Sequence, residues 1–242
     1  MPVELLLLSN SRVFGMGYLE HALPAVAAFL DGRRTVHFAP YALADHAGYT
    51  ARVRAALAPL GVETVGLAEV ADPRAAVGAA EILFVGGGNS FRLLKALEER
   101  ALLAPVRERV AAGALRYLGA SAGTNMACPS LRTTNDMPIV QPPSFAALGF
   151  VPFQINPHYL DPQPGSTHMG ETREQRLTEF LECNDVPVLG LREGTWLRVS
   201  DGTATLGGKL DARLFRRGEE PRELPAGSDA SWLLSAPAAF DA

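Results

Sequence analysis

The amino-acid sequence predicts an α/β protein with a doubly wound, mostly parallel sheet that is flanked by helices. Short apolar runs alternate with longer amphipathic stretches, and most of the runs are apolar at every position instead of at every second one. That pattern is typical of parallel strands that are buried on both faces of a sheet. A chain of 242 residues fits one α/β unit with a substantial core, so we expect a single domain over residues 1–242.

In the first half of the chain the predicted strands and helices follow one another in turn. The strand segments are residues 3–9, 35–40, 63–67, 81–87 and 115–120. The helical segments, which carry apolar residues at helical spacing and glycine near several ends, are residues 17–32, 48–61, 72–81 and 90–114. This alternation is what predicts a doubly wound sheet.

Beyond Ala127 the pattern becomes less regular. Residues 129–149 are rich in proline and polar side chains, which predicts long loops with a short strand at residues 137–140. A helix is expected within residues 170–184. A further strand is expected at residues 186–191, and short strands that indicate an antiparallel edge near the C-terminus are expected at residues 195–200, 203–208 and 212–218.

Composition and charge argue against several classes of partner. The chain has 48% hydrophobic residues, 20% charged residues and a formal net charge of -4, with no block of like charge that would attract nucleic acid or an anionic membrane. The apolar segment at residues 3–9 is too short to cross a bilayer and lacks a basic flank. Cys128 and Cys183 are too few for a disulfide framework and lack metal-ligand spacing. We therefore expect a cytoplasmic protein without membrane or nucleic-acid partners.

The segment YLGASAGTNMA, residues 117–127, places Ser121 between small residues at the end of a predicted strand. A Gly-x-Ser-x-Gly pattern at a sharp strand-to-helix turn lifts the serine hydroxyl above the carboxyl edge of the sheet, where it can act as a nucleophile. The N–H of Ala122 would point to the same space and could stabilise an oxyanion. The pattern also fits a close-packed turn capped by serine, and these five residues alone do not separate the two interpretations.

A glycine-rich loop at Gly86, Gly87 and Gly88 also ends a predicted strand and opens a helix. In an open α/β sheet both loops lie at the carboxyl edge, where ligands bind. The N–H of Gly88 is therefore a candidate second oxyanion donor. The loop matches neither the dinucleotide-binding nor the phosphate-binding glycine pattern, which disfavours a nucleotide.

A serine nucleophile requires a base, and the chain offers five histidines. His158 follows an apolar run and an Asn-Pro pair, which places it at a strand end and makes it the favoured base. The others lie in helical, strand or polar loop segments, where a structural or exposed histidine is the usual outcome. These four are His21, His37, His46 and His168.

An acid must orient such a histidine and stabilise its charged form. Glu193 follows a later apolar strand and precedes a glycine turn, whereas Asp136 lies in a loop that is nearer to the serine in sequence. Either carboxylate could also be an ordinary solvated loop residue, so both remain candidates.

Six segments carry a resemblance to a known family: LLLLSNS, VGGGNSF, GASAGTNMACPSLRTTNDMPIV, INPHY, GETREQRL and GLREG. They resemble peptidase E, the α-aspartyl dipeptidases of a serine peptidase family that also includes the more distant cyanophycinases. The resemblance implies a sheet similar to that of class I glutamine amidotransferases, with a flavodoxin-like arrangement. It also implies hydrolysis of dipeptides with an N-terminal aspartate (Asp-X) without a metal or cofactor.

The resemblance further implies roles for individual residues. Ser121 is the expected nucleophile, His158 the expected base and Glu193 the expected third member of the triad. Gly88 and Ala122 are expected to form the oxyanion hole.

Specificity for aspartate requires a cation, and Arg173 in GETREQRL offers a planar fork that suits a carboxylate. Its alternative interpretation is a charge on the surface of a helix, in which case Arg132 or Arg176 would bind the substrate carboxylate. Asp136 and Asn89 are further expected substrate-binding residues.

Two other functions remain open. One is a hydrolase similar to cyanophycinase that acts on β-linked or longer aspartyl peptides. The other is a non-catalytic ligand-binding protein of the same fold, which the joint presence of Ser121, His158 and Glu193 disfavours. For the dipeptidase we expect a small peptide substrate, an Asp-X dipeptide, and we expect the chain to be a monomer or homodimer.

Overall fold

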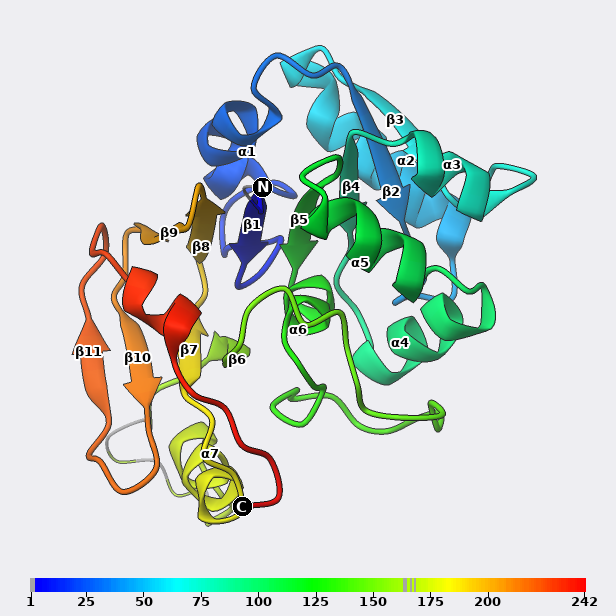
Figure 1. The fold of residues 1–242 in the computed structure, drawn as a ribbon. Helices are drawn as coiled ribbons and strands as arrows, with labels where there is room; N and C mark the ends of the chain where they lie inside the picture. Colours follow the sequence, from blue (N-terminus) through cyan, green and yellow to red (C-terminus); the bar gives the residue numbers. More distant parts are fainter. Residues whose placement is uncertain (1–2, 163–164, 166, 168) are drawn as a thin grey trace.

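A seven-stranded sheet forms the centre of the computed structural model, which describes residues 3–162, 165, 167 and 169–242 (Figure 1). Its strand order is β3-β2-β4-β5-β1-β8-β9. The parallel strands are β1 (Leu5–Leu8), β2 (Thr35–Ala39), β3 (Glu63–Gly66), β4 (Ile82–Val85) and β5 (Arg116–Ala120). The antiparallel strands β8 (Thr195–Ser200) and β9 (Thr203–Gly208) complete one edge. The mostly parallel sheet and its antiparallel C-terminal edge are confirmed.

Helices cover both faces of this sheet because its central strands carry buried apolar side chains on both sides, most completely in β1 and β4. In β1, Leu6 and Leu8 pack into a core with α1 (Leu23–Leu30) and α2 (His46–Leu57). Leu5 and Leu7 point to the opposite face, and all four leucines are 0% exposed. That face is covered by α3 (Pro73–Ala79), α4 (Ser90–Glu99), α5 (Leu103–Ala111) and α6 (Ala122–Ala127). Each fully buried leucine contributes about 1.5–3 kcal/mol to the stability of the fold, and the doubly wound prediction is confirmed.

The long helical segment predicted at residues 90–114 is two helices in the structure. After α4 the backbone turns at Ala101, whose φ is 51°, and the N–H of Leu102 donates to the carbonyl of Leu97. Pro105 lies in the first turn of α5 and has no N–H to donate back to Ala101. A continuous helix would lose that hydrogen bond and would force the proline ring against the preceding turn.

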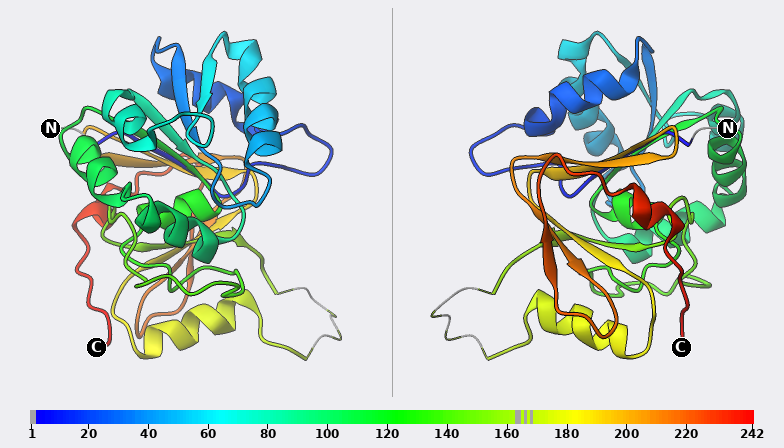
Figure 2. Two further views of the ribbon diagram at one scale, coloured as in Figure 1. Left: turned by 90° about the vertical axis from the view of Figure 1, so that its right-hand side faces the viewer. Right: turned by 60° about the vertical axis from the view of Figure 1, so that its left-hand side comes forward.

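Four strands of the described chain form a second sheet, in the order β11-β10-β7-β6. They are β6 (Gln154–Tyr159), β7 (Val188–Arg192), β10 (Ala212–Phe215) and β11 (Arg222–Leu224). The helix α7 (Arg173–Glu182) packs against this sheet through Leu177 and Leu181, which contact a cluster that contains Tyr159 (Figure 2). The strands β6 and β7 are parallel neighbours, so their carboxyl ends lie side by side.

Two sequence predictions are wrong in this region. The segment at 212–218 does not extend the antiparallel edge of the first sheet, because the chain at residues 227–230 already hydrogen-bonds to the outer side of β9. It pairs instead with β7. Residues 137–140 form no strand, because Pro138 lacks a donor and the carbonyl of Met137 accepts a hydrogen bond from Asn89.

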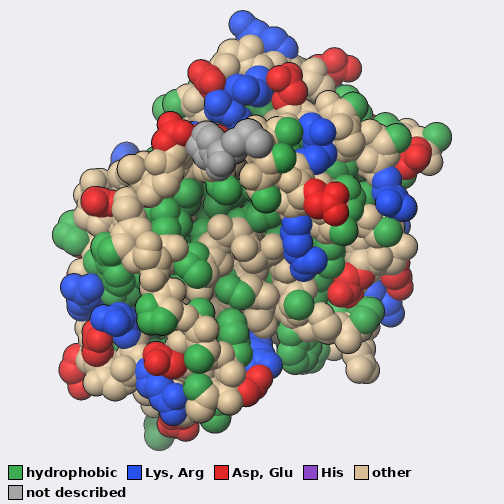
Figure 3. Space-filling model, viewed as in Figure 1, with side chains coloured by type: hydrophobic (Ala, Val, Ile, Leu, Met, Phe, Trp, Pro, Cys, Tyr) green, Lys and Arg blue, Asp and Glu red, His purple; other side chains and the backbone are tan. Residues whose placement is uncertain are grey.

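Acidic and basic side chains are interspersed over the face of the molecule that Figure 3 shows. Among the described residues, no helix has the length and apolar character that a membrane crossing needs.

Candidate active site

Ser121 occupies a sharp turn between β5 and α6. Its φ is 53° and its ψ is -111°, a backbone conformation that costs a residue other than glycine about 1–3 kcal/mol. The surrounding structure compensates for this strain. The N–H of Ser121 donates to the carbonyl of Leu8 at 3.1 Å, and the hydroxyl of Thr124 donates to the same oxygen at 2.6 Å. The serine is thereby presented at the carboxyl edge of the sheet.

The small residues of the turn are required by space. A Cβ atom on Gly123 would lie 2.0 Å from the carbonyl oxygen of Val85, on the neighbouring strand β4. The carbonyl of Gly123 in turn accepts a hydrogen bond of 2.6 Å from the hydroxyl of Tyr117. The backbone of α6 therefore packs directly against the sheet, which only small residues allow.

Ser121, His158 and Glu193 form one hydrogen-bonded line. The Oγ of Ser121 lies 3.0 Å from the Nε2 of His158, and the Nδ1 of His158 lies 2.7 Å from the Oε1 of Glu193. The side chains of His158 and Glu193 are 39% and 46% exposed, so the line is open to solvent along one side. The three residues come from the ends of β5, β6 and β7.

The backbone of His158 is held in place by Ser9. A β-bulge separates Pro157 from Tyr159, and His158 within it has a φ of 53°. Its N–H donates to the Oγ of Ser9 at 3.0 Å, while that hydroxyl donates to the carbonyl of Leu191 at 2.8 Å. Ser9 is 0% exposed. One buried hydroxyl therefore joins the strand of the histidine to the strand that leads to Glu193.

Asn10 holds the next turn in a similar way, because its Oδ1 accepts a hydrogen bond of 2.8 Å from the N–H of Gly194. Sequence reasoning did not assign a role to Ser9 or Asn10. A signal was present, since this polar pair directly follows the apolar strand β1, and the carboxyl ends of parallel strands are where such sheets build their sites.

The remaining histidines among the described residues do not contact Ser121. Burial lowers the pKa of His21 and of His37, and neither ring nitrogen of His21 has a hydrogen-bond partner within the described part of the chain. The ring of His46 packs edge-on against Tyr41. His168 lies outside the described residues.

The two candidate acids have different surroundings. Glu193 reaches His158, whereas the Oδ2 of Asp136 accepts hydrogen bonds from the N–H and hydroxyl of Ser90, at 2.7 and 2.6 Å. Within the described residues the other oxygen of Asp136, Oδ1, accepts no hydrogen bond. The geometry therefore favours Glu193 as the partner of the histidine and leaves one carboxylate oxygen of Asp136 available.

Asn89 caps the helix α4, where its Oδ1 accepts from the N–H of Arg92 at 3.0 Å. Its Nδ2 donates to the carbonyl of Met137 at 2.8 Å. Both ends of the amide are thus engaged in structure, and this geometry does not support direct contact between Asn89 and a substrate.

A polar pocket of about 380 Å³ opens on one side of Ser121 and His158. Among the described residues, its wall contains one arginine, Arg173, together with the carboxylates Asp136 and Glu193. Burial, reinforced by the nearby charge of Arg176, lowers the pKa of Arg173, while Asp136 acts in the opposite direction. No salt bridge to Arg173 is formed by the described carboxylates, so its guanidinium is available to a ligand.

The other two candidate cations are already paired. Arg132 binds both oxygens of Asp241, at 2.6 and 2.9 Å, and Arg176 lies 3.5 Å from Glu171. Neither arginine lines the pocket beside Ser121. The sequence left the choice among three arginines open, and the geometry favours Arg173.

The expected oxyanion donors both lie beside the serine. Ala122 is the first residue of α6, so its N–H has no acceptor inside the helix. Gly88 has a φ of 133°, and a Cβ atom there would lie 2.6 Å from the carbonyl of Ala42. Glycine is therefore required at this position of the loop. The described residues provide no acceptor for either N–H, which leaves both available to a ligand.

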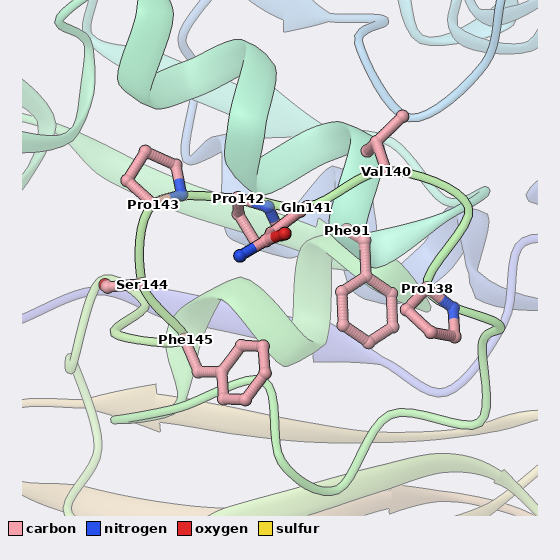
Figure 4. Close-up of a pocket in the computed structure, with 8 residues that line it drawn as sticks. All are labelled: Phe91, Pro138, Val140, Gln141, Pro142, Pro143, Ser144 and Phe145. Atoms are coloured by element: carbon pink, nitrogen blue, oxygen red, sulfur yellow. The ribbon is translucent and has the colours of Figure 1, made fainter.

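A larger cavity of about 440 Å³ lies between Phe91 of α4 and the loop at residues 138–145 (Figure 4). None of its lining residues is titratable, so it offers no acid–base chemistry. Within the described ranges there is also no group of three or more His, Cys, Asp or Glu side chains that could hold a metal ion.

The fold and this geometry define a class of protein: an α/β enzyme with a serine, a histidine and a carboxylate in line at the carboxyl edge of its sheets. The same arrangement serves hydrolases of several unrelated folds. A family model described as peptidase family S51 matches residues 5–207. The chain belongs to peptidase family S51 and is a peptidase.

Individual relatives agree with this family. The chain is 64% identical over 239 residues to peptidase E of Streptomyces coelicolor, covering 99% of this chain and 98% of the relative. It is 52% identical to a Drosophila melanogaster protein named "Probable alpha-aspartyl dipeptidase", covering 96% and 97% of the two chains. The crystal structure of a peptidase from an acI-B1 actinobacterium has a TM-score of 0.63 at 17% identity, over 93% of this chain and 95% of that one, which supports the fold alone.

Proposed function

We propose that this peptidase is a serine-type dipeptidase that hydrolyses Asp-X dipeptides through an acyl-enzyme on Ser121. The observation that carries the proposal is the hydrogen-bonded line of Ser121, His158 and Glu193 beside a pocket whose cation is Arg173. The names of the relatives support the same substrate class.

The first half of the reaction forms the acyl-enzyme. The Nε2 of His158 accepts the proton of Ser121 as the serine oxygen attacks the scissile carbonyl carbon. The Nδ1–H of His158 donates to Glu193, which stabilises the imidazolium that forms. The N–H groups of Gly88 and Ala122 donate to the oxyanion of the tetrahedral intermediate. His158 then passes its proton to the leaving amine as the C–N bond breaks.

The second half repeats these steps with water. His158 accepts a proton from a water molecule, whose oxygen attacks the ester carbonyl carbon. The bond to the serine oxygen breaks, the proton returns to Ser121, and aspartate is released. His158 therefore accepts and returns each proton that is transferred in the two halves of the reaction.

Specificity follows from the charges of the pocket. The guanidinium of Arg173 can bind both oxygens of the substrate's aspartyl carboxylate. The free Oδ1 of Asp136 lies in the same pocket and can accept a hydrogen bond from the α-ammonium of the substrate. A peptide with an N-terminal aspartate carries both of these charges on one residue.

The test compares hydrolysis of Asp-Leu, Asn-Leu, Leu-Asp and the β-linked isomer of Asp-Leu, with release of free leucine as the measurement. We expect Asp-Leu to be the preferred substrate and Ser121→Ala to lower kcat by about 10⁴-fold or more while the protein stays folded. Near-normal turnover by Ser121→Ala would rule out the nucleophile. Preference for the β-linked isomer would instead support the cyanophycinase-like activity.

Arg173→Met is expected to lower kcat/KM for Asp-Leu by roughly 30-fold or more, because a binding charge loses its partner. It should also reduce the preference for Asp-Leu over Asn-Leu. Arg176→Met, which removes a paired charge from the same helix, is the matched control and should keep that preference. If Arg173→Met keeps it as well, another group binds the aspartyl carboxylate.

A further inference from the structure

A second pocket, of about 220 Å³, opens on the other side of the catalytic pair, and Ser121 and His158 line it as well. Its remaining wall comes from the loop after β1, from α2 and from the glycine loop with Gly88. The candidate nucleophile and base therefore stand between two pockets. A peptide bond held at Ser121 would extend one residue into each of them.

The two pockets differ in charge. The polar pocket with Arg173 contains carboxylates. The second pocket is lined by Arg12 and Arg52 and, within the described part of the chain, by no Asp or Glu. The described carboxylates form no salt bridge with either arginine. Both guanidinium groups act on Tyr18, where they oppose the rise in pKa that burial causes. The second pocket is thus a positively charged site whose cations are unpaired within the described chain.

The two arginines are held differently. Arg52 projects from α2, and its guanidinium carbon lies 5.9 Å from the centre of the Tyr49 ring, which is 3% exposed. The hydroxyl of Tyr49 lies 3.1 Å from that of Tyr18, so one wall of the pocket is a connected pair of tyrosines. Arg12 comes from a loop that projects from the body of the protein (Figure 2) and exposes Phe14 fully. Arg52 thus lies on a helix beside an aromatic ring, whereas Arg12 lies on a loop.

We propose that this second pocket binds the C-terminal residue of the dipeptide, and that Arg52, assisted by Arg12, binds its free α-carboxylate. This inference rests on the proposed dipeptidase function. In a dipeptide the carboxylate lies one residue beyond the scissile bond, and neighbouring Cα atoms are only about 3.8 Å apart. A longer peptide has a neutral amide at that position. The arginine pair would therefore select dipeptides over longer chains.

The test uses two substrates that differ only at this carboxylate: Asp-Leu and Asp-leucinamide. Arg52→Met should lower kcat/KM for Asp-Leu by about 10- to 100-fold, mainly through KM, because a charge-assisted hydrogen bond is lost. The same variant should change kcat/KM for Asp-leucinamide by less than about twofold. Arg12→Met should show the same selectivity with a smaller loss on Asp-Leu.

Arg54→Met is the matched control. This arginine lies two residues further along α2 and is 2.8 Å from Glu69, outside the residues that line the second pocket. The Arg54→Met variant removes the same charge from the same helix and should leave kcat/KM for both substrates unchanged. Thermal unfolding of each variant, measured alongside, verifies that the protein is folded.

Equal losses on Asp-Leu and Asp-leucinamide, or no loss on either, would overturn the inference. A smaller preference for Asp-Leu over Asn-Leu in Arg52→Met would also overturn it, because the pocket would then hold the aspartyl side chain. Calorimetric binding of both compounds to Ser121→Ala separates this inference from the proposed function, since it needs no turnover. Tighter binding of Asp-Leu that is lost in the Ser121→Ala/Arg52→Met double variant supports the pocket assignment even if the chain hydrolyses neither compound.

Discussion

Ser9→Ala tests how the two sheets hold the histidine. The hydroxyl of Ser9 is buried and makes two hydrogen bonds, of 3.0 Å with the N–H of His158 and 2.8 Å with the carbonyl of Leu191. Alanine leaves both backbone groups without this partner. Each unsatisfied buried group costs about 1–3 kcal/mol, so we expect the free energy of unfolding to fall by about 2–6 kcal/mol.

The same substitution should lower kcat more than it changes KM. The hydrogen bond from His158 to Ser9 helps to hold a backbone φ of 53°, which is strained for a histidine. Without it the imidazole shifts relative to Ser121, and a displacement of about 1 Å can cost roughly 100-fold in rate. Ser9 lines neither pocket beside Ser121, so substrate binding should change little.

Urea unfolding measures the stability change, and initial rates on Asp-Leu measure kcat and KM. The control is Thr64→Val on β3, since Thr64 is buried and its hydroxyl has no hydrogen-bond partner among the described residues. That variant should lose neither stability nor activity. Wild-type stability and wild-type kcat in Ser9→Ala would refute the argument that this hydroxyl positions the histidine.

Three further predictions follow from the geometry. Glu193→Gln should lower kcat by roughly 100-fold or more while Asp136→Asn mainly raises KM, because only the former carboxylate contacts the histidine; steady-state kinetics with the reverse order would exchange their roles. Arg192 holds the pKa of Asp161 and of Glu223 below their ordinary values. Arg192→Met should therefore be less stable than the wild type at neutral pH, and its stability should approach that of the wild type as pH falls below about 4.5. Unfolding curves at several pH values measure this difference. Gly123→Ala should reduce the melting temperature sharply, since its Cβ would lie 2.0 Å from the carbonyl of Val85; an unchanged melting temperature would contradict the close packing of α6.

The sign of the Arg192 prediction comes from its partners. Hydrogen bonds from Arg192 lower the pKa of Asp161 and of Glu223, and their distances to its guanidinium are 2.6 and 2.7 Å. Carboxyls with a lowered pKa in the folded state contribute stability above their unfolded pKa. They lose it as pH falls through the folded pKa. Asp161 and Glu223 are 51% and 40% exposed, so solvent screening keeps the contribution modest.

Much of the central sheet could be predicted from local pattern, because its parallel strands are short, mainly apolar runs that alternate with helical segments. The turn at Ser121 could also be predicted from local pattern, because small residues at the end of a strand indicate a sharp turn. The hydrophobic pattern does not predict the break at Ala101, because apolar residues continue at helical spacing through this position. This spacing also takes no account of the proline in the following turn.

The second sheet could not be predicted because the sequence shows which segments are strands but not which edges are free. β10 pairs with β7 since residues 227–230 occupy the outer side of β9, a contact that depends on the whole tertiary fold. Likewise, which of the carboxylates Glu193 and Asp136 contacts His158 depends on distances between loops, which the sequence does not give. The arginines of the second pocket, Arg12 and Arg52, are surface charges in the sequence and share a site only after folding.

The origin of the three aligned side chains in two different sheets has a consequence for biosynthesis. Ser121 directly follows β5 of the central sheet, whereas His158 lies in β6 and Glu193 directly follows β7 of the second sheet. A nascent chain that has emerged only as far as α6 contains Ser121 but not His158, its proposed base. Because β6 and β7 are synthesised after α6, we expect hydrolytic activity only once these later strands have folded against the central sheet. We therefore expect a product that is truncated after α6 to have no peptidase activity.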